Sequence, residues 1–301
     1  MDFTKNMSLA FCKVFSFLKR SAYIKTSRRP NDSGQNKERR YAMDNVVSRT
    51  LSVHKEHELL LKLEKAGLTD SDAQAIIQSP DNYLAKRIAI LARNWDFKPS
   101  DSQVAARKIM GKNFFGMEEA MQYFFFNPTL AERESFARVP FSTKDLHALK
   151  ETHKLIVKLP ISAENILQIM GPDMFSFKGR LSEDLTLMRE RGPCGWQLIR
   201  KTALPDSTER SFKGQSGLLG NDQEMPTIYE MIYMIAAHYL QTKEILFADR
   251  AVHTQTIRIR DDEPRHLAIG VFNDEKRWQV YASGEYSCTR LGLAVQKKWH
   301  V

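Results

Sequence analysis

Residues 226–240 read PTIYEMIYMIAAHYL, which is the clearest helical pattern in the chain. Pro226 stands where a first helical residue is favoured, because the fixed φ of proline suits that position and its missing N–H is not needed there. Behind it, apolar residues recur with the period of 3.6 that marks an amphipathic helix. This apolar stripe consists of Ile228, Met231, Ile232, Ile235, Ala236, Tyr239 and Leu240. We therefore expect the helix to be the central packing element of its domain, with Ile232 and Ile235 almost fully buried.

Three bulky side chains of this helix fall away from the centre of the stripe. Truncating Tyr229 or Tyr233 should therefore destabilise the fold less than truncating either isoleucine. His238 lies at the flank of the stripe. We expect it to have a hydrogen-bond partner and not to bind a metal.

Strand-like segments precede and follow the helix. Residues 196–200 alternate between apolar and polar, and four further segments cover 256–260, 267–272, 277–281 and 289–296. Short polar turns separate the first three of these four, which predicts an antiparallel β-meander. The predicted fold class is therefore α+β, with a helical N-terminal part and a C-terminal domain whose long helix packs on the meander.

The earlier part of the chain reads as helical. Residues 57–94 give three short helices, with Gly67 as a C-terminal cap of the first and Thr69 or Asp70 as an N-terminal cap of the second. Residues 102–170 stay mostly helical, and 155–159 form the first plausible strand. The predicted domains are a basic, disordered tail (1–45), a helical region (46–170) and an α+β domain (171–301).

The composition is that of a globular protein with an unusual tail. The 301 residues are 42% hydrophobic and carry a net charge of +9. Residues 1–42 hold ten basic and three acidic residues, which leaves 35 basic and 33 acidic residues in the remainder. The high isoelectric point therefore belongs to the tail. No run reaches the roughly 18 apolar residues of a membrane span, so we expect no transmembrane segment.

The tail admits several interpretations. Residues 9–23 can form a basic amphipathic helix, which suits an anionic membrane surface, and residues 25–42 form a polar, basic linker. Nucleic-acid binding through residues 1–42 would equally fit this charge. A third interpretation is that translation starts at Met43 instead of Met1, which would remove the tail.

Motifs for catalysis and metal binding are weak. The three cysteines (Cys12, Cys194 and Cys288) are scattered, which favours a reducing compartment and predicts a cytoplasmic location. Cys194 with a histidine could form a catalytic pair, which is the enzymatic alternative. His54 and His57 lie one helical turn apart, but nothing completes a metal site around them, so no metal and no cofactor are expected.

The C-terminal third resembles the C-type-lectin-like domains related to formylglycine-generating enzymes. The order that carries the resemblance is Gly195-Trp196 in a strand, Met225-Pro226-Thr227 opening a helix with Glu230, Trp278 within the meander, and LGLAV at 291–295. The family's Gly-Gly-Ser-Trp stretch and its paired cysteines are missing, so the resemblance implies a binding role without the family's catalysis. Residues 50–301 as a whole also resemble a group of uncharacterised bacterial proteins.

These observations favour a non-catalytic module that binds a protein or a small ligand through the β-rich domain. Trp, Tyr and Arg dominate binding hot spots, and the meander region contains several of them. The predicted ligand-binding residues are Arg258, Arg260, Trp278, Tyr281, Tyr286 and Arg290. The alternative is that Trp278 and one of the tyrosines are core residues.

Overall fold

The fold is seen in a computed structural model. It describes residues 52–79, 83–93, 97–171, 173–178, 181, 184–192, 194–260, 263–271, 277–283 and 290–298. The predictions about the tail lie outside these residues. The chain divides into two compact units, 1–85 and 86–301, and each is described by itself.

The first unit contains the predicted short helices. They are α2 (Val53–Lys65), α3 (Asp70–Gln78) and α4 (Tyr83–Arg93), of which α4 runs on into the second unit. Gly67 follows α2 with a φ of +93°, the left-handed region that glycine tolerates. Thr69 caps α3 in a capping box with Asp72, as its spacing predicts. α3 buries none of its residues, and Leu60 and Ile77 are 60% and 73% exposed.

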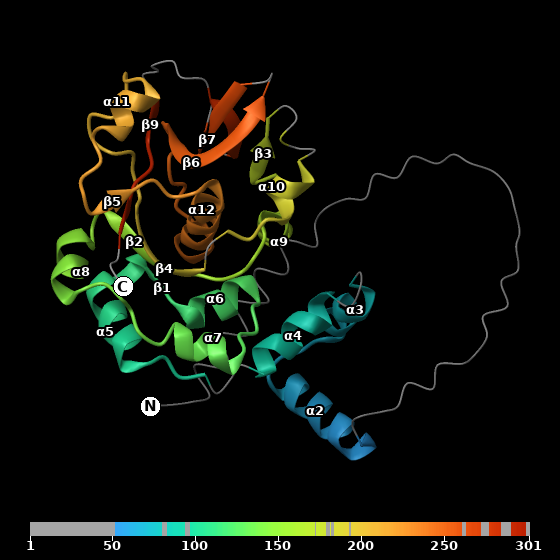
Figure 1. Cartoon of the computed structure of the whole chain (residues 1–301). Helices are drawn as coiled ribbons and strands as arrows, with labels where there is room; N and C mark the ends of the chain where they lie inside the picture. Colours follow the sequence, from blue (N-terminus) through green and yellow to red (C-terminus); the bar gives the residue numbers. More distant parts are fainter. Residues whose placement is uncertain are drawn as a thin grey trace, which may run out of the picture. The chain divides into compact units, whose positions relative to one another are not determined.

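The second unit surrounds one central helix with shorter ones (Figure 1). The helices are α5 (Asp101–Met110), α6 (Met117–Phe124), α7 (Leu130–Ser135), α8 (Thr143–Leu149), α9 (Ala163–Met170), α10 (Leu185–Arg189), α11 (Phe212–Ser216) and α12 (Ile228–Thr242), with the 3-10 turn η2 (Gly111–Asn113). Most begin at a Ser, Thr or Asp whose side-chain oxygen accepts a backbone N–H, which explains where the chain starts each helix.

Sheet A is five-stranded, in the order β1-β2-β4-β10-β5. Its strands are β1 (Phe114–Phe115), β2 (His153–Lys158), β4 (Gly195–Arg200), β10 (Gln296–Lys297) and β5 (Gln223–Glu224). β1 pairs parallel to β2 and the other pairings are antiparallel. The predicted strands at 155–159 and 196–200 are confirmed as β2 and β4.

Sheet B is also five-stranded, in the order β3-β8-β7-β6-β9. Its strands are β3 (Phe175–Phe177), β8 (Trp278–Ser283), β7 (Glu263–Val271), β6 (Ala251–Arg260) and β9 (Leu291–Leu293). β6, β7 and β8 form the predicted antiparallel meander, with a register shift in β6 between His253 and Ile257. The last predicted strand, 289–296, is wrong in its extent, because its residues divide between β9 in sheet B and β10 in sheet A.

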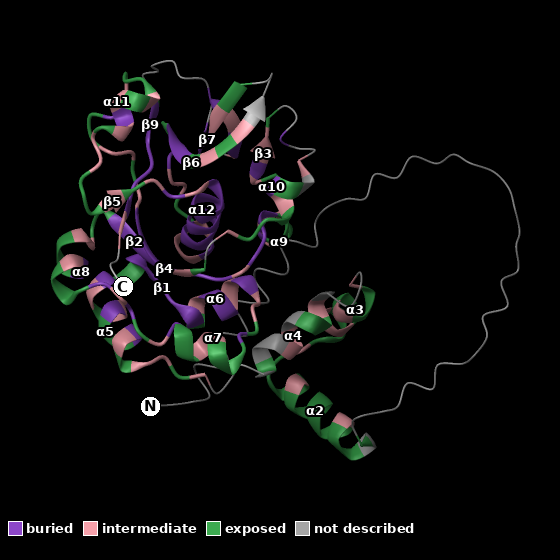
Figure 2. Ribbon diagram, in the orientation of Figure 1, coloured by how far each residue is buried: buried purple, intermediate pink, exposed green. Residues whose placement is uncertain are grey.

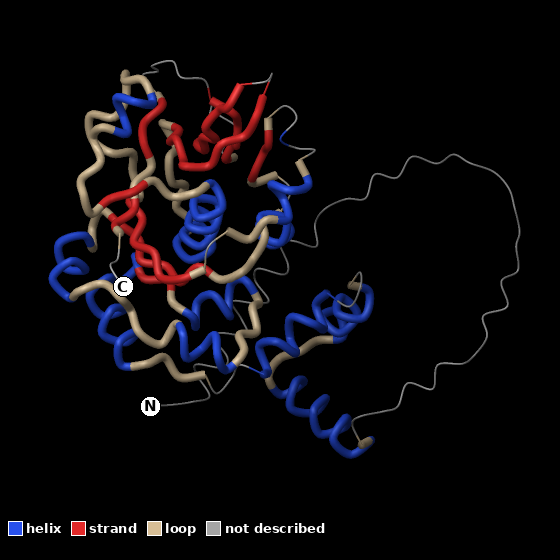
Figure 3. Tube along the Cα trace, viewed as in Figure 1, coloured by secondary structure: helices blue, strands red, loops and turns tan. Residues whose placement is uncertain are grey.

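The long helix α12 lies between the two sheets and contacts both (Figure 3). It is buried along almost its whole length; only Tyr239, Gln241 and Thr242 are partly exposed (Figure 2). The tyrosines away from the stripe are buried as well: Tyr233 is 0% exposed and donates a hydrogen bond to the carbonyl of Val157. A helix covered on both sides must bury every face, so its central stripe does not rank its residues by burial.

Compact packing joins regions that the sequence assigns to different domains. Sheet A takes β1 and β2 from the predicted helical region and β4, β5 and β10 from the predicted α+β domain. The division between compact units therefore lies at residues 85 and 86, and none lies at 170. The fold class is α+β, as predicted.

Candidate functional site

The six predicted ligand-binding residues do not form one exposed patch. Trp278 is 0% exposed; it packs between Phe175 and Tyr239 and donates a hydrogen bond to the carbonyl of Leu246. Its predicted exposure is therefore wrong, and the core interpretation holds. A tryptophan is large enough that its buried rings stabilise the domain, which removes the need for a ligand to explain it.

The remaining members of that predicted patch are separated by sheet B. Arg258 lies opposite Arg265 and Tyr281 opposite Ala268 on β7, and positions 265 and 268 point to opposite faces. Arg258 accordingly reaches Asp184 and Tyr229 on the α12 side, while Tyr281 packs near Ala268 on the other. Arg290 is exposed. Tyr286 and the side chain of Arg260 lie outside the described residues.

Cys194 is exposed, and no histidine is placed beside it by the strand pairing. Its neighbour Gly195 pairs with Lys158 at one end of the β2–β4 ladder, and His153 pairs with Arg200 at the other end. Five residue steps of about 3.3 Å put these ends roughly 17 Å apart. His238 bonds to Glu244 instead, and this confirms its expected hydrogen-bond partner.

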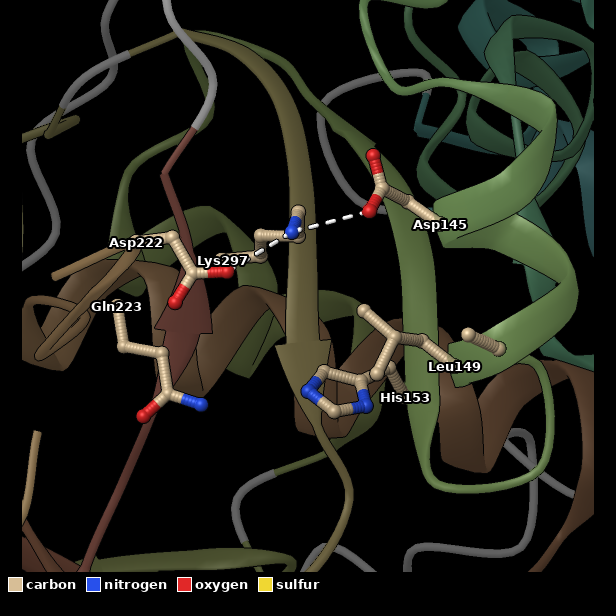
Figure 4. A pocket seen from close by; sticks show the side chains of 7 residues that line it. Asp145, Leu149, His153, Asp222, Gln223 and Lys297 are labelled. Carbon is tan, nitrogen blue, oxygen red and sulfur yellow. Dashed lines mark hydrogen bonds and ion pairs between the residues drawn. The ribbon is translucent and has the colours of Figure 1, made fainter. Parts of the chain in front are cut away.

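A pocket of about 200 Å³ lies at the His153 end of that ladder (Figure 4). Its lining residues are Asp145, Ala148 and Leu149 of α8, His153 of β2, Asp222 and Gln223 at β5, and Lys297 of β10. Lys297 Nζ lies 3.0 Å from Asp145 Oδ1 and 3.0 Å from Asp222 Oδ2, so one ammonium group joins α8 to the segment before β5.

Local structure stabilises the charged forms of Lys297, Asp145 and Asp222. Ser142 caps α8 and donates a hydrogen bond of 2.6 Å to Asp145, which lowers the pKa of that carboxyl group together with Lys297. The hydrogen bond from Lys297 lowers the pKa of Asp222, and the two aspartates raise the pKa of Lys297. All three groups are therefore charged at neutral pH, and the lysine is paired with both aspartates.

His153, which lines the pocket, lies near three cations. His153 is 4% exposed, and burial followed by the charges of Arg200, Lys297 and Lys201 lowers its pKa to about 4. Arg200 lies directly opposite His153 on β4, on the same face of sheet A. Within the described part of the chain no carboxylate pairs with Arg200, and its buried Nε has no hydrogen-bond partner.

Two lysines lie buried on the other face of β2, toward α12. Lys154 Nζ donates to Gln241 Oε1 at 2.7 Å and to the carbonyl of Lys112 at 3.3 Å, and Lys158 donates to the carbonyls of Leu159 and Arg191. Both are 0% exposed. Because burial disfavours the charged form, the pKa of Lys154 falls to about 7 and that of Lys158 to about 8.

Part of the signal for these residues is present in the sequence, although no motif marks them. Lys154 and Lys158 occupy alternate positions of an otherwise apolar strand, which places them on one face with Ile156. The pairing of Lys297 with Asp145 and Asp222 joins positions far apart along the chain, so no local pattern marks it.

Comparison with known proteins provides no relative from which a function could be transferred. No protein-family model, no curated protein and no solved structure matches the chain. The resemblance to C-type-lectin-like domains therefore stays a prediction. Among the described residues, no three His, Cys, Asp or Glu side chains gather as a metal site, and no helix there could cross a membrane.

Proposed function

We propose that this chain is a binding protein whose pocket beside Lys297 takes a small acid, through a carboxylate or phosphate group. The observation that carries the proposal is Arg200, which lies opposite the pocket residue His153 and has no carboxylate partner in the described part of the chain. A buried polar group without a partner calls for a ligand or an ordered water. The guanidinium fork matches the oxygens of a carboxylate or phosphate in pairs.

The electrostatics of the pocket support an anion over a cation. Asp145 and Asp222 both form ion pairs with Lys297. The pKa of His153 is lowered by the nearby cations Arg200, Lys297 and Lys201. An anion beside His153 would be attracted by these cations, whereas a cation would be repelled by them. The pocket is smaller than the 300–1,000 Å³ of typical drug-sized sites, which favours a compact acid.

Anion-dependent stabilisation would test the proposal. Thermal unfolding would be followed in 10 mM sodium phosphate, and separately in 10 mM acetate, against sodium chloride at equal ionic strength. A ligand with a Kd of about 1 mM would stabilise the folded chain by about 1.4 kcal/mol at this concentration. The phosphate and acetate arms separate the two kinds of acid.

Two variants make this test specific for the pocket. Arg200→Gln should abolish the gain, while Arg210→Gln, which removes an arginine bonded to the carbonyl of Asp206, should retain it. The proposal is wrong if neither anion stabilises the wild-type chain more than chloride does. It is equally wrong if Arg200→Gln keeps the full gain.

A further inference from the structure

A second polar arrangement lies on the face of sheet B that points away from α12. His253 of β6 lies opposite Ala268 and Ser283 of β8 lies opposite His266, and positions 266 and 268 share one face of β7. His253 Nε2 is 2.9 Å from Ser283 Oγ, and His253 Nδ1 is 2.7 Å from Oε1 of Gln215 on α11. Three separate elements thus supply one chain of hydrogen bonds.

The donor and the acceptor in each of these hydrogen bonds follow from the contact that Gln215 makes with Leu291. Gln215 Nε2 donates to the carbonyl of Leu291 at 2.8 Å, and because a carbonyl only accepts, this contact fixes the orientation of the amide. Gln215 Oε1 therefore accepts from His253 Nδ1, which must carry the hydrogen. Burial lowers the pKa of His253 to about 4, so the ring is neutral at pH 7 and its Nε2 presents a lone pair. Ser283 Oγ–H then donates to Nε2.

Aromatic contacts hold the imidazole in this position. The ring of Phe212 on α11 meets that of His253 edge-on, with centroids 5.3 Å apart, and stacks on His266 at 3.5 Å. Exposure decreases along the chain of hydrogen bonds, from 7% at Ser283 to 1% at His253 and 0% at Gln215. All three residues are buried, and Ser283 is the least enclosed of them, with the base behind it shielded from water.

We infer that Ser283 is a nucleophile with His253 as its general base and Gln215 as a positioning residue, and that it hydrolyses carboxylic esters. Ser283 Oγ forms a bond to the ester carbonyl carbon while its proton passes to His253 Nε2. The carbon–oxygen bond to the alcohol then breaks, and the alcohol leaves with that proton. Water attacks the acyl-serine by the same route, which releases the acid and restores the hydroxyl.

The neutral amide explains the choice of esters over amides. In serine proteases a carboxylate stabilises the imidazolium that forms during attack, and Gln215 supplies orientation without that charge. The weaker base suits a substrate with a good leaving group, such as an ester. This site lies on sheet B and is independent of the pocket on sheet A.

Covalent labelling of the full chain would test the inference. A fluorophosphonate probe reacts with activated serines by forming an oxygen–phosphorus bond and releasing fluoride. Intact mass and peptide mapping should show one adduct on Ser283. Ser283→Ala should lose the adduct together with any hydrolysis of p-nitrophenyl acetate. Ser216→Ala is the matched control, because its hydroxyl bonds to the carbonyl of Phe212 on the same short helix, and it should react like wild type.

Further comparisons separate activation by the fold from simple exposure. His253→Gln should lower the labelling rate at least tenfold, and Gln215→Leu should do the same. Gln215→Glu keeps an acceptor for His253 Nδ1–H, so its labelling rate should stay close to that of the wild type. Wild-type chain unfolded in urea should lose the reaction, which provides a test even where a variant fails to fold. The inference is wrong if the folded chain gives no adduct on Ser283, or if urea or His253→Gln leaves the rate unchanged. Equal rates for Gln215→Leu and wild type would remove the role of Gln215.

Discussion

Lys154→Met should stabilise the chain at low pH and do so much less at high pH. The lysine is 0% exposed, and burial lowers its pKa to about 7 from an ordinary value of 10.5. Between these two pH values the unfolded chain binds more protons at this position than the folded chain does. The free energy of unfolding of the wild type therefore rises with pH across this window. Methionine has a similar length and carries no charge, so the variant lacks this slope.

The size of the effect follows from the pKa. At 1.36 kcal/mol for each pH unit, burying Lys154 costs about 5 kcal/mol at pH 6, where it stays charged in the fold, and about 2 kcal/mol at pH 9, where it loses its proton on folding. The variant also leaves Gln241 Oε1 without its donor, which costs about 1–3 kcal/mol at either pH. We therefore expect Lys154→Met to gain about 2–4 kcal/mol at pH 6 and close to nothing at pH 9.

Urea denaturation of both chains at pH 6 and pH 9 would measure this difference. The change in the mutational effect between the two pH values, about 3 kcal/mol, does not depend on the lost hydrogen bond. Lys158→Met is the matched comparison, because a pKa of about 8 predicts a smaller change of about 1.4 kcal/mol. If the effect of Lys154→Met differed by less than about 0.5 kcal/mol between pH 6 and pH 9, the desolvation argument would be refuted.

Three further outcomes are expected. Tyr233→Ala should cost about 3–5 kcal/mol in urea denaturation and Ile232→Ala about 2–5 kcal/mol, since both side chains are fully buried; a loss below 1 kcal/mol for the tyrosine would contradict this packing. Gly270→Ala should lower the melting temperature, because a Cβ there would lie 2.4 Å from Ala251 Cα and overpacking costs about 1–3 kcal/mol; an unchanged melting temperature would contradict the close approach. By calorimetry, sulfate should bind several-fold more tightly at pH 5 than at pH 7. The reason is that a bound anion favours protonated His153 and so raises its pKa from about 4. His153→Gln should remove this pH dependence.

The central helix shows how much of the fold can be predicted from local sequence. The start predicted at Pro226 is wrong by two residues, because the Thr227–Glu230 capping box makes Thr227 the N-cap and α12 begins at Ile228. The burial of Tyr233 could not be predicted, because it depends on a second sheet whose strands come from distant parts of the chain. Periodicity identifies one apolar face, and it does not report how many layers will cover the helix.

The candidate site was beyond sequence reasoning for a related cause. Trp278 matches a binding hot spot by residue type, and residue type alone does not separate an anchor on a surface from a core side chain. Lys297 lies beside Asp222 because β10 pairs with β5, and no sequence motif predicts this pairing. The buried lysines were closer to prediction, since charged residues at alternate positions of a strand conflict with the apolar face around them.

The course of the segment 290–298 has a consequence for how the protein is made. β10 stands between β4 and β5, so these two strands are joined within sheet A only through a segment synthesised after both of them. A ribosome adds about 5–20 residues each second. While the roughly 70 residues between β5 and β10 are being added, the edges of β4 and β5 that pair with β10 have no partner strand. Sheet A is therefore completed only after β10 has been synthesised, and the nascent chain before that point is the state in which chaperones would matter most.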